Sequence, residues 1–297
     1  MKRKGITLIE LLVVIVVTVL FVGVLMPSLN RSRQLAYRLL CATNLRGIGS
    51  TMAVYAGDNE GQYPRAGGAG IVWGDAGHIS QWCGPGAGPP EPYAFCDGTA
   101  TITSCFFLLV KYDYMGVKQF YCRGDEGAGI FRADEAQLRY PLANAWDFGG
   151  GVRQTKAGNF GVWPGECVSY SYHMPFNIDP ETPGFPIWAA SRPDSPVCAD
   201  RNPHLDVYAT APDVAANTLA HQGKGQNVLY KGGRVVFEQT PRVGLNADNI
   251  WTYGGDPATG GGDPNGTPPV DVGDGYPIGR TFSNDAYLVN EIQTGYL

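Results

Sequence analysis

The sequence predicts an α+β protein in which one long N-terminal helix packs on an antiparallel β-sheet head with long Gly/Pro-rich loops. A mostly apolar run fills positions 6–26, and an amphipathic helical pattern follows it. Farther on, "NVLYKGGRVVFEQ" (227–239) has two β-rich runs around a glycine turn. The 41 Gly and 22 Pro among 297 residues favour a loop-rich head over a helical bundle.

The apolar run at 6–26 is long enough to cross a membrane as a helix. It would span about 31 Å at about 1.5 Å per residue. Three cations at positions 2–4 predict a cytoplasmic N-terminus, with the rest of the chain on the other side. No A-x-A-like site follows, which disfavours an ordinary signal peptide. A plain anchor leaves Glu10 unexplained, because a carboxylate in lipid costs about 2.5–3.5 kcal/mol.

Beyond the run, Pro27 predicts a kink because an interior proline removes a helix hydrogen bond; a simple helix break there is the alternative. The helix is expected to continue to about residue 56, where a Gly-rich segment (57–61) ends it. This gives a leader (1–5), a membrane helix (6–26), an amphipathic stem helix (27–56) and a head (57–297). One stripe of the stem is expected to face the head: Cys41, Leu45, Ile48, Met52 and Tyr55.

The head is predicted to be a sheet connected by irregular loops. Residues 63–100 are expected to be loops, and 104–112 a short helix rather than a buried strand. Strands are predicted within 168–176 and 196–200. The hairpin pairs 227–230 with 234–239 around Lys231-Gly232-Gly233.

The chain has seven cysteines, and Cys41 is interpreted as a small buried residue of the stem stripe. An outward-facing head would lie in a compartment that permits disulfides, so the other six could form up to three bridges. At least one bridge is expected, with Cys83–Cys96 a local candidate and isolated buried thiols the alternative. Zinc is disfavoured, since there is no C-x2-C pair and the four histidines lack ligand spacing. The six candidates are Cys83, Cys96, Cys105, Cys122, Cys167 and Cys198.

Charge is divided unevenly along the chain. Residues 1–46 hold seven of the 22 Lys and Arg but one of the 27 Asp and Glu. Positions 47–297 therefore hold 15 basic and 26 acidic residues, a balance of −11. Nucleic-acid backbones need basic surface, so we expect no nucleic-acid partner.

Motifs for catalysis and cofactors are weak. The sequence contains neither G-x-S-x-G nor a Gly-rich phosphate loop, so no enzymatic activity and no organic cofactor are expected. A Gly/Pro-rich segment (253–277) holds four acids that could bind calcium with loop carbonyls, although a solvated loop is the favoured interpretation. These acids are Asp256, Asp263, Asp271 and Asp274.

The first residues resemble a known family. "GITLIE" (5–10), after its basic leader, is similar to the processing site of type IV pilins and type II secretion pseudopilins, with Ile6 where Phe is usual. The resemblance implies that prepilin peptidase cuts between Gly5 and Ile6 and that the new Ile6 amine is methylated. It further implies that Glu10 pairs with the Ile6 amine of a neighbouring subunit and sets the axial register. Pro27 matches the place where pilin helices bend during assembly.

Three further segments resemble a large group of bacterial pilin-like proteins. "RLLCATNLRGIGSTMAVYAGDNEGQYP" (38–64) is similar to that group's C-x-N-N-L-K-Q-I-G-x-A stem, and "FYCRGDEG" (120–127) to its F-x-C-P-x-D. "AHQGKGQNVLYKGGRVVF" (220–237) resembles its signature of His, nine residues and Asp-Gly. Lys231 replaces that Asp here, and Arg234 replaces the usual following His. The cell-adhesion tripeptide Arg-Gly-Asp (123–125) falls within the second segment and is interpreted as accidental.

The resemblance implies a structural subunit of a type IV pilus or a type II secretion pseudopilus. Its partners would be the inner membrane, prepilin peptidase and other copies or related pilin-like subunits. The head would lie in the periplasm, or on a cell-surface filament, and a pseudopilus would take part in protein secretion. A non-polymerising, membrane-tethered binding protein is the alternative. An anchored hydrolase would need a cleft that joins a nucleophile to a histidine.

Overall fold

A computed structural model of the 297-residue chain describes residues 7–66, 102–125, 128–131, 147–148, 152–155, 158–161, 164–176, 187, 189–205, 213–256, 261–267 and 288–289. It confirms the α+β class, with a long N-terminal helix and an antiparallel sheet. Several predicted site residues lie outside the described residues: Gly5, Ile6, Cys83, Cys96, Asp271 and Asp274.

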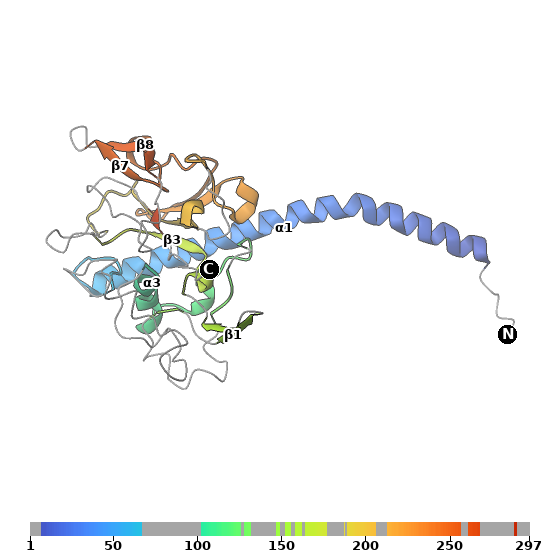
Figure 1. The fold of residues 1–297 in the computed structure, drawn as a ribbon, viewed down its shortest axis with the longest axis horizontal. Coiled ribbons are helices and arrows are strands. Elements are labelled where there is room, and N and C mark those ends of the chain that lie inside the picture. Colours follow the sequence, from blue (N-terminus) through green and yellow to red (C-terminus); the bar gives the residue numbers. More distant parts are fainter. Residues whose placement is uncertain are drawn as a thin grey trace.

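The dominant element is helix α1, Leu8–Asp58, which runs unbroken for 51 residues. Its N-terminal half projects away from the head, and its C-terminal half lies within it (Figure 1). The helix continues through Pro27, so the alternative of a helix break there is wrong. At the far end it passes the predicted boundary at residue 56 by two residues. Gly61, with a φ of +83°, then turns the chain in a conformation that glycine adopts without strain.

The main sheet has five strands in the order β6-β5-β4-β3-β9, and each neighbouring pair is antiparallel. The predicted hairpin is β5–β6, closed at Gly233, whose φ of +84° meets the demand of a tight turn. The strand predictions at 168–176 and 196–200 are also confirmed. The strands are β3 (Tyr170–His173), β4 (Pro196–Asp200), β5 (Gln226–Tyr230), β6 (Val235–Glu238) and β9 (Leu288–Val289).

Smaller elements surround this sheet. Helix α3 (Ile102–Lys111) confirms the short apolar helix expected near 104–112. Two antiparallel ribbons pair β1 with β2 and β7 with β8. The ribbon strands are β1 (Val152–Thr155), β2 (Gly158–Gly161), β7 (Tyr253–Asp256) and β8 (Gly261–Thr267). The short 3-10 turns are η2 (Val117–Phe120), η4 (Pro164–Cys167), η5 (Pro203–Leu205), η6 (Ala220–Gly223) and η7 (Leu245–Ala247).

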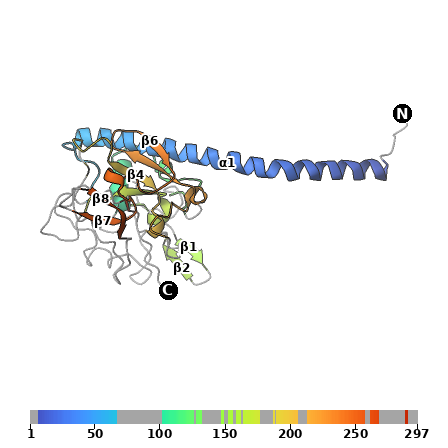
Figure 2. The same ribbon diagram turned by 90° about the horizontal axis from the view of Figure 1, so that it is seen from above.

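Helix α1 lies along the sheet, as Figure 2 shows from above, and residues of α1, β3, β4 and β5 form one core cluster. Strand alternation divides β5, because Leu229 joins this core while Val228 and Tyr230 join a second cluster around Trp251 on the other face. At Gly49, α1 comes so close that an added Cβ would lie 2.8 Å from a methyl of Leu229. The predicted stem stripe is buried in full: Cys41, Leu45, Ile48, Met52 and Tyr55.

Candidate functional site

The N-terminal half of α1 presents apolar side chains that no other described residue covers. No residue from 8 to 40 is buried, and the exposed fractions reach 80% at Leu8 and 75% at Val24. Burying one large apolar side chain is worth about 1.5–3 kcal/mol, so this surface favours a bilayer or other apolar helices. Among the described residues, α1 is the helix long and apolar enough to cross a membrane.

The first turn of α1 carries the carboxylate that the sequence singled out. Thr7 is the N-cap, and it forms a capping box with Glu10. The Thr7 amide and hydroxyl donate to Oε2 of Glu10 at 2.8 and 2.9 Å, and the Glu10 amide donates to the Thr7 hydroxyl at 3.3 Å. Within the described residues these bonds use one oxygen of an exposed carboxylate, which leaves Oε1 to a second donor.

Pro27 lies in the exposed half of the helix, where its ring removes one backbone hydrogen bond. The unmatched carbonyl belongs to Gly23, four residues earlier. A Cβ added at Gly23 would meet nothing within 4 Å. This pair therefore makes a locally weak turn without ending the helix, and α1 is gently curved in Figure 1.

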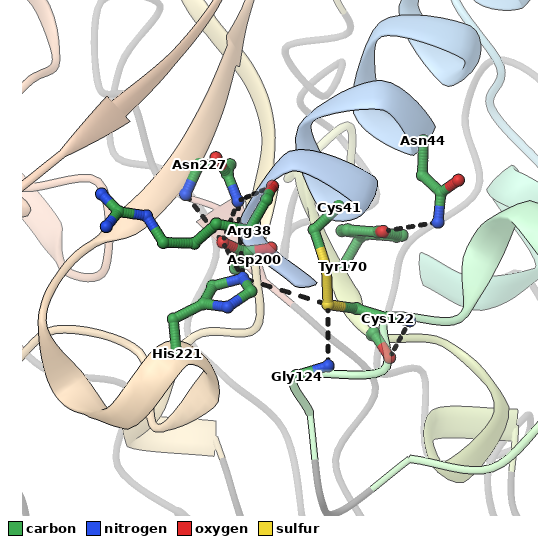
Figure 3. A network of polar contacts seen from close by, with 10 residues as sticks. Arg38, Cys41, Asn44, Cys122, Gly124, Tyr170, Asp200, His221 and Asn227 are labelled. Atoms are coloured by element: carbon green, nitrogen blue, oxygen red, sulfur yellow. Dashed lines mark hydrogen bonds and ion pairs between the residues drawn. A yellow bond between two sulfur atoms is a disulfide. The ribbon is translucent and has the colours of Figure 1, made fainter. Parts of the chain in front are cut away.

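A disulfide joins the stem to the head where α1 enters it. Cys41 on α1 is bonded to Cys122, across 81 residues of sequence (Figure 3). Cys41 was expected to be only a small buried residue, and that interpretation is wrong, because the helix register places it opposite one of the six candidates. Three other candidates, Cys105, Cys167 and Cys198, are buried thiols.

Polar contacts at the same level fix the axial position of the helix. The side-chain amide of Asn44 donates from Nδ2 to the backbone carbonyl of Tyr121 and to the hydroxyl of Tyr170, both at 3.1 Å. Burial raises the pKa of Tyr170 well above its usual value, and the nearby charge of Asp200 adds to this, so the hydroxyl stays neutral. The stem is thus held to the head by covalent and polar contacts as well as by apolar packing.

Beside the disulfide lies a buried group of polar side chains from three separate segments (Figure 3). The Asn227 amide N–H and side chain donate to Oδ2 of Asp200 at 2.7 and 3.0 Å. Nε2 of His221 is 3.3 Å from the same oxygen and 3.9 Å from Sγ of Cys122. Asp200 and His221 are almost completely buried, so each depends on these neighbours in place of water.

The backbone is strained to bring His221 into this group. His221 and Gln222 have φ values of 57° and 65°, a left-handed conformation that is costly for residues with a Cβ. The imidazole lies directly over Gly124, where an added Cβ would be 2.8 Å from the ring. The glycine of the Arg-Gly-Asp tripeptide is therefore required by packing.

The aspartate of that tripeptide also has a structural role. Oδ2 of Asp125 is 3.3 Å from Nε of Arg201, and both side chains are at least nine-tenths buried. Arg201 also donates to the carbonyls of Gly165 and Val168, each at 2.7 Å. A buried, paired aspartate cannot serve as a surface adhesion signal, which agrees with the accidental interpretation.

The composition of the buried group invites comparison with a nucleophilic relay. In such a relay the nucleophile and the carboxylate use opposite nitrogens of the imidazole. Here Cys122 and Asp200 both face Nε2 of His221, and the sulfur is already bonded to Cys41. The group as it stands lacks an activated nucleophile.

The calcium candidates are only partly described. Asp256 ends β7 and Asp263 lies in β8, on adjacent antiparallel strands in which Asp256 pairs with Gly261. The other two acids lie outside the described residues. Calcium binding at these four acids stays a prediction.

The sequence alone did not indicate that the three segments similar to pilin-like proteins (38–64, 120–127 and 220–237) lie next to one another in the fold. Cys41 comes from the stem segment, Cys122 from the second segment, and His221 and Asn227 from the third. A signal was present, because each of the three quoted segments contains one cysteine or histidine, and these are the residues that meet. Asp200, which completes the group, lies in none of these segments.

Comparisons of the chain with protein-family models, with curated proteins and with solved structures found no match.

Proposed function

We propose that this chain is a structural prepilin-like subunit. It is processed between Gly5 and Ile6, methylated on Ile6, and assembled into a type IV pilus-like or type II secretion pseudopilus filament. Before assembly it is held in the bacterial inner membrane by one span, with its head in the periplasm. Its work is packing and pairing between subunits, without covalent chemistry beyond its own processing.

The observation that carries the proposal is the exposed apolar half of α1 with a carboxylate in its first turn. A head-stabilising helix would bury a stripe, yet none of residues 8–40 is buried in the part of the chain that the structure describes. Before assembly a bilayer would bury this apolar surface, and after assembly the neighbouring helices of the filament core would bury it.

Glu10 gives the assembly its register. After removal of the leader, the Ile6 amine would be a cation at a helix start, where it adds to the positive end of the helix dipole. Thr7 already holds Oε2 of Glu10, and Oε1 remains for the amine of another copy. Pairing compensates for the cost of burying both charges. Because the pair can form only at one axial position of one subunit relative to the next, it also sets the register.

The joint at Cys41 and Cys122 supports the same function. A filament subunit must carry its head at a fixed height above its membrane helix. The disulfide and the Asn44 contacts fix α1 against the head at that level. Helix register in the filament core would therefore set the arrangement of heads on its surface.

A cavity favours the second candidate, a membrane-tethered binding protein that does not polymerise. The cavity, about 390 Å³, lies where α1 meets η6. Its lining includes the cations Arg31, Arg38 and Lys224 and no acid. A basic cavity close to the end of the apolar run would attract an anion, so this candidate predicts a ligand instead of a filament.

Substituting Glu10 separates the two candidates. The Glu10→Gln variant keeps the side-chain shape and removes the charge. We expect normal loss of the leader, normal membrane insertion, and at least a tenfold loss of subunits recovered in sheared filaments. Recovery is measured by quantitative immunoblotting of filament and membrane fractions.

Glu60→Gln is the matched control, because Glu60 is an exposed acid at the opposite end of α1. It should leave incorporation unchanged. Equal recovery of Glu10→Gln and wild-type chains in filaments would contradict the pairing mechanism. Absence of wild-type filaments, with the mature chain confined to the membrane, would favour the tethered binding protein.

A further inference from the structure

We propose that the thiol form of this chain binds one Zn²⁺ ion at the joint between stem and head. The four ligands are Cys41, Cys122, Asp200 and His221. The inference is independent of filament assembly, since it concerns the folded head and the helix that crosses it.

The geometry of the four side chains fits one small cation. Their ligand atoms all lie within 4.8 Å of one another. Tetrahedral zinc, with bonds of about 2.0–2.3 Å, needs ligand atoms about 3.3–3.8 Å apart. The observed separations of 3.3 Å between His221 and Asp200 and 3.9 Å between His221 and Cys122 are already close to this. The set of two sulfurs, one imidazole and one carboxylate suits zinc better than the harder cations.

Burial gives the site its driving force. All four residues are buried, and Oδ1 of Asp200 has no hydrogen-bond partner among the described residues. A buried carboxylate with an unused oxygen is costly unless a cation meets it. A zinc ion would bond to the carboxylate and the imidazole, whose side chains are almost completely buried.

The surroundings already orient the ligands. Both nitrogens of Asn227 donate to Oδ2 of Asp200, and its side chain also donates to the Arg38 carbonyl at 3.4 Å. The strained backbone at His221 directs Nε2 toward the sulfurs. Hydrogen bonds of this kind hold metal ligands in place and tune their basicity.

The metal and the disulfide are alternative states of the same two sulfurs. Zinc binds them as thiolates, so two thiols release two protons when the ion enters. Disulfide formation instead removes two protons and two electrons, which pass to an oxidant of the dithiol-disulfide type. Every cysteine is incorporated into the chain as a thiol, so the metal-binding form exists before oxidation. Either state cross-links α1 to the head.

The test uses the full chain in detergent, with Co²⁺ as a spectroscopic probe. A water-soluble phosphine reduces the disulfide: with one water molecule it yields two thiols and the phosphine oxide. The phosphine is then removed without air. We expect the reduced chain to bind one equivalent of Co²⁺ with thiolate-to-metal charge-transfer absorption and strong tetrahedral d–d bands, both abolished by Zn²⁺. The oxidised chain should show neither.

Variants locate the site. Cys41→Ser should at least halve the charge-transfer absorption, because one of two thiolate ligands is lost, and Asp200→Asn and His221→Ala should each weaken Co²⁺ binding at least about tenfold. Cys198→Ser is the matched control, because Cys198 is another buried thiol of the head and should leave the spectrum intact. An unchanged spectrum in Cys41→Ser, or loss of it in Cys198→Ser alone, would overturn the assignment.

Circular dichroism covers the case in which the reduced chain loses structure. We then expect one equivalent of Zn²⁺ to restore the far-UV spectrum of the wild type and of Cys198→Ser, and not that of Cys41→Ser. A folded reduced chain without the cobalt bands would refute the proposal. An unfolded reduced chain that zinc does not restore would refute it equally.

Discussion

The two halves of α1 have similar backbones and opposite environments. From Leu8 to Met26 the helix is apolar on most sides and no residue is buried, whereas from Cys41 onward it is apolar along one stripe that is buried without gaps. The distribution of apolar side chains around the axis therefore predicts the surroundings better than their number does. All-round apolarity calls for lipid or several helices, and a stripe calls for one partner surface.

We expect the largest effect from removal of the disulfide, which would leave the stem half of the helix held to the head by apolar packing and the Asn44 hydrogen bonds. Closing a loop across 81 residues lowers the entropy of the unfolded chain by the equivalent of about 4.5 kcal/mol. We therefore expect the Cys41→Ala/Cys122→Ala variant to lose about 4 kcal/mol of head stability. Urea unfolding followed by tryptophan fluorescence measures it, because Trp251 is fully buried.

Cys198→Ala controls for the loss of a buried sulfur without a bridge. It should cost about 1 kcal/mol, typical of a small core deletion. Equal losses in the two variants would mean that the bridge adds nothing to the attachment of stem to head.

A smaller effect comes from adding one methyl group to each half of the helix. Gly49→Ala places a Cβ 2.8 Å from Leu229, and we expect about 1–3 kcal/mol of destabilisation from overpacking. Gly23→Ala meets nothing within 4 Å, so head stability should not fall. Within the buried half, Gly47→Ala has its nearest contact at 3.6 Å and serves as a second control.

Thermal unfolding of the three glycine variants in the same detergent measures these differences. A loss at Gly23 as large as that at Gly49 would show that the exposed half also packs against protein within one chain. That result would remove the contrast between the two halves.

The smallest effect that we expect is a dependence of head stability on pH, caused by Tyr55 near the C-terminal end of α1. Burial, with added effects from Tyr112, Cys105 and Tyr114, raises the pKa of Tyr55 to about 12. The unfolded chain ionises this tyrosine near pH 10, so its contribution is complete below pH 10 and is lost as the pH rises toward 12. The slope for one proton is at most about 1.4 kcal/mol per pH unit.

In the wild type the free energy of unfolding should fall between pH 10 and 12. In Tyr55→Phe this fall should be less steep, by up to about 1.4 kcal/mol per pH unit. Urea midpoints at several pH values in that range measure it. Tyr37→Phe is the control, since Tyr37 lies on α1 outside the buried stripe and is not among the groups that act on Tyr55. An unaltered slope in Tyr55→Phe would mean that the phenol ionises equally in the folded and unfolded chains.

Local patterns predicted much of this fold, because they depend on neighbouring residues. The stem stripe, helix α3, strand β4 and the β5–β6 hairpin each follow from spacing or turn chemistry within a few residues. The Cys41–Cys122 bond could not be found that way. It depends on the rotation and height of α1 against the head, which are set by distant contacts such as Gly49 against Leu229.

The buried group at His221 was unpredictable for a related reason. A left-handed backbone at His221 and Gln222 contradicts the local preference of both residues. Only the finished head, with Gly124 beneath the ring and Asp200 beside it, holds the imidazole there. The N-terminal site is the opposite case, since the acid and the apolar run are visible in the sequence, while the partner that we propose for them is a second copy of the chain.

The most direct test of the central claim is the intact mass and N-terminal sequence of the mature chain purified from membranes. The account predicts a chain that begins at Ile6, lacks the five leader residues and carries one methyl group on its terminal amine. A chain that still begins at Met1, or one cut near residue 30, would contradict it.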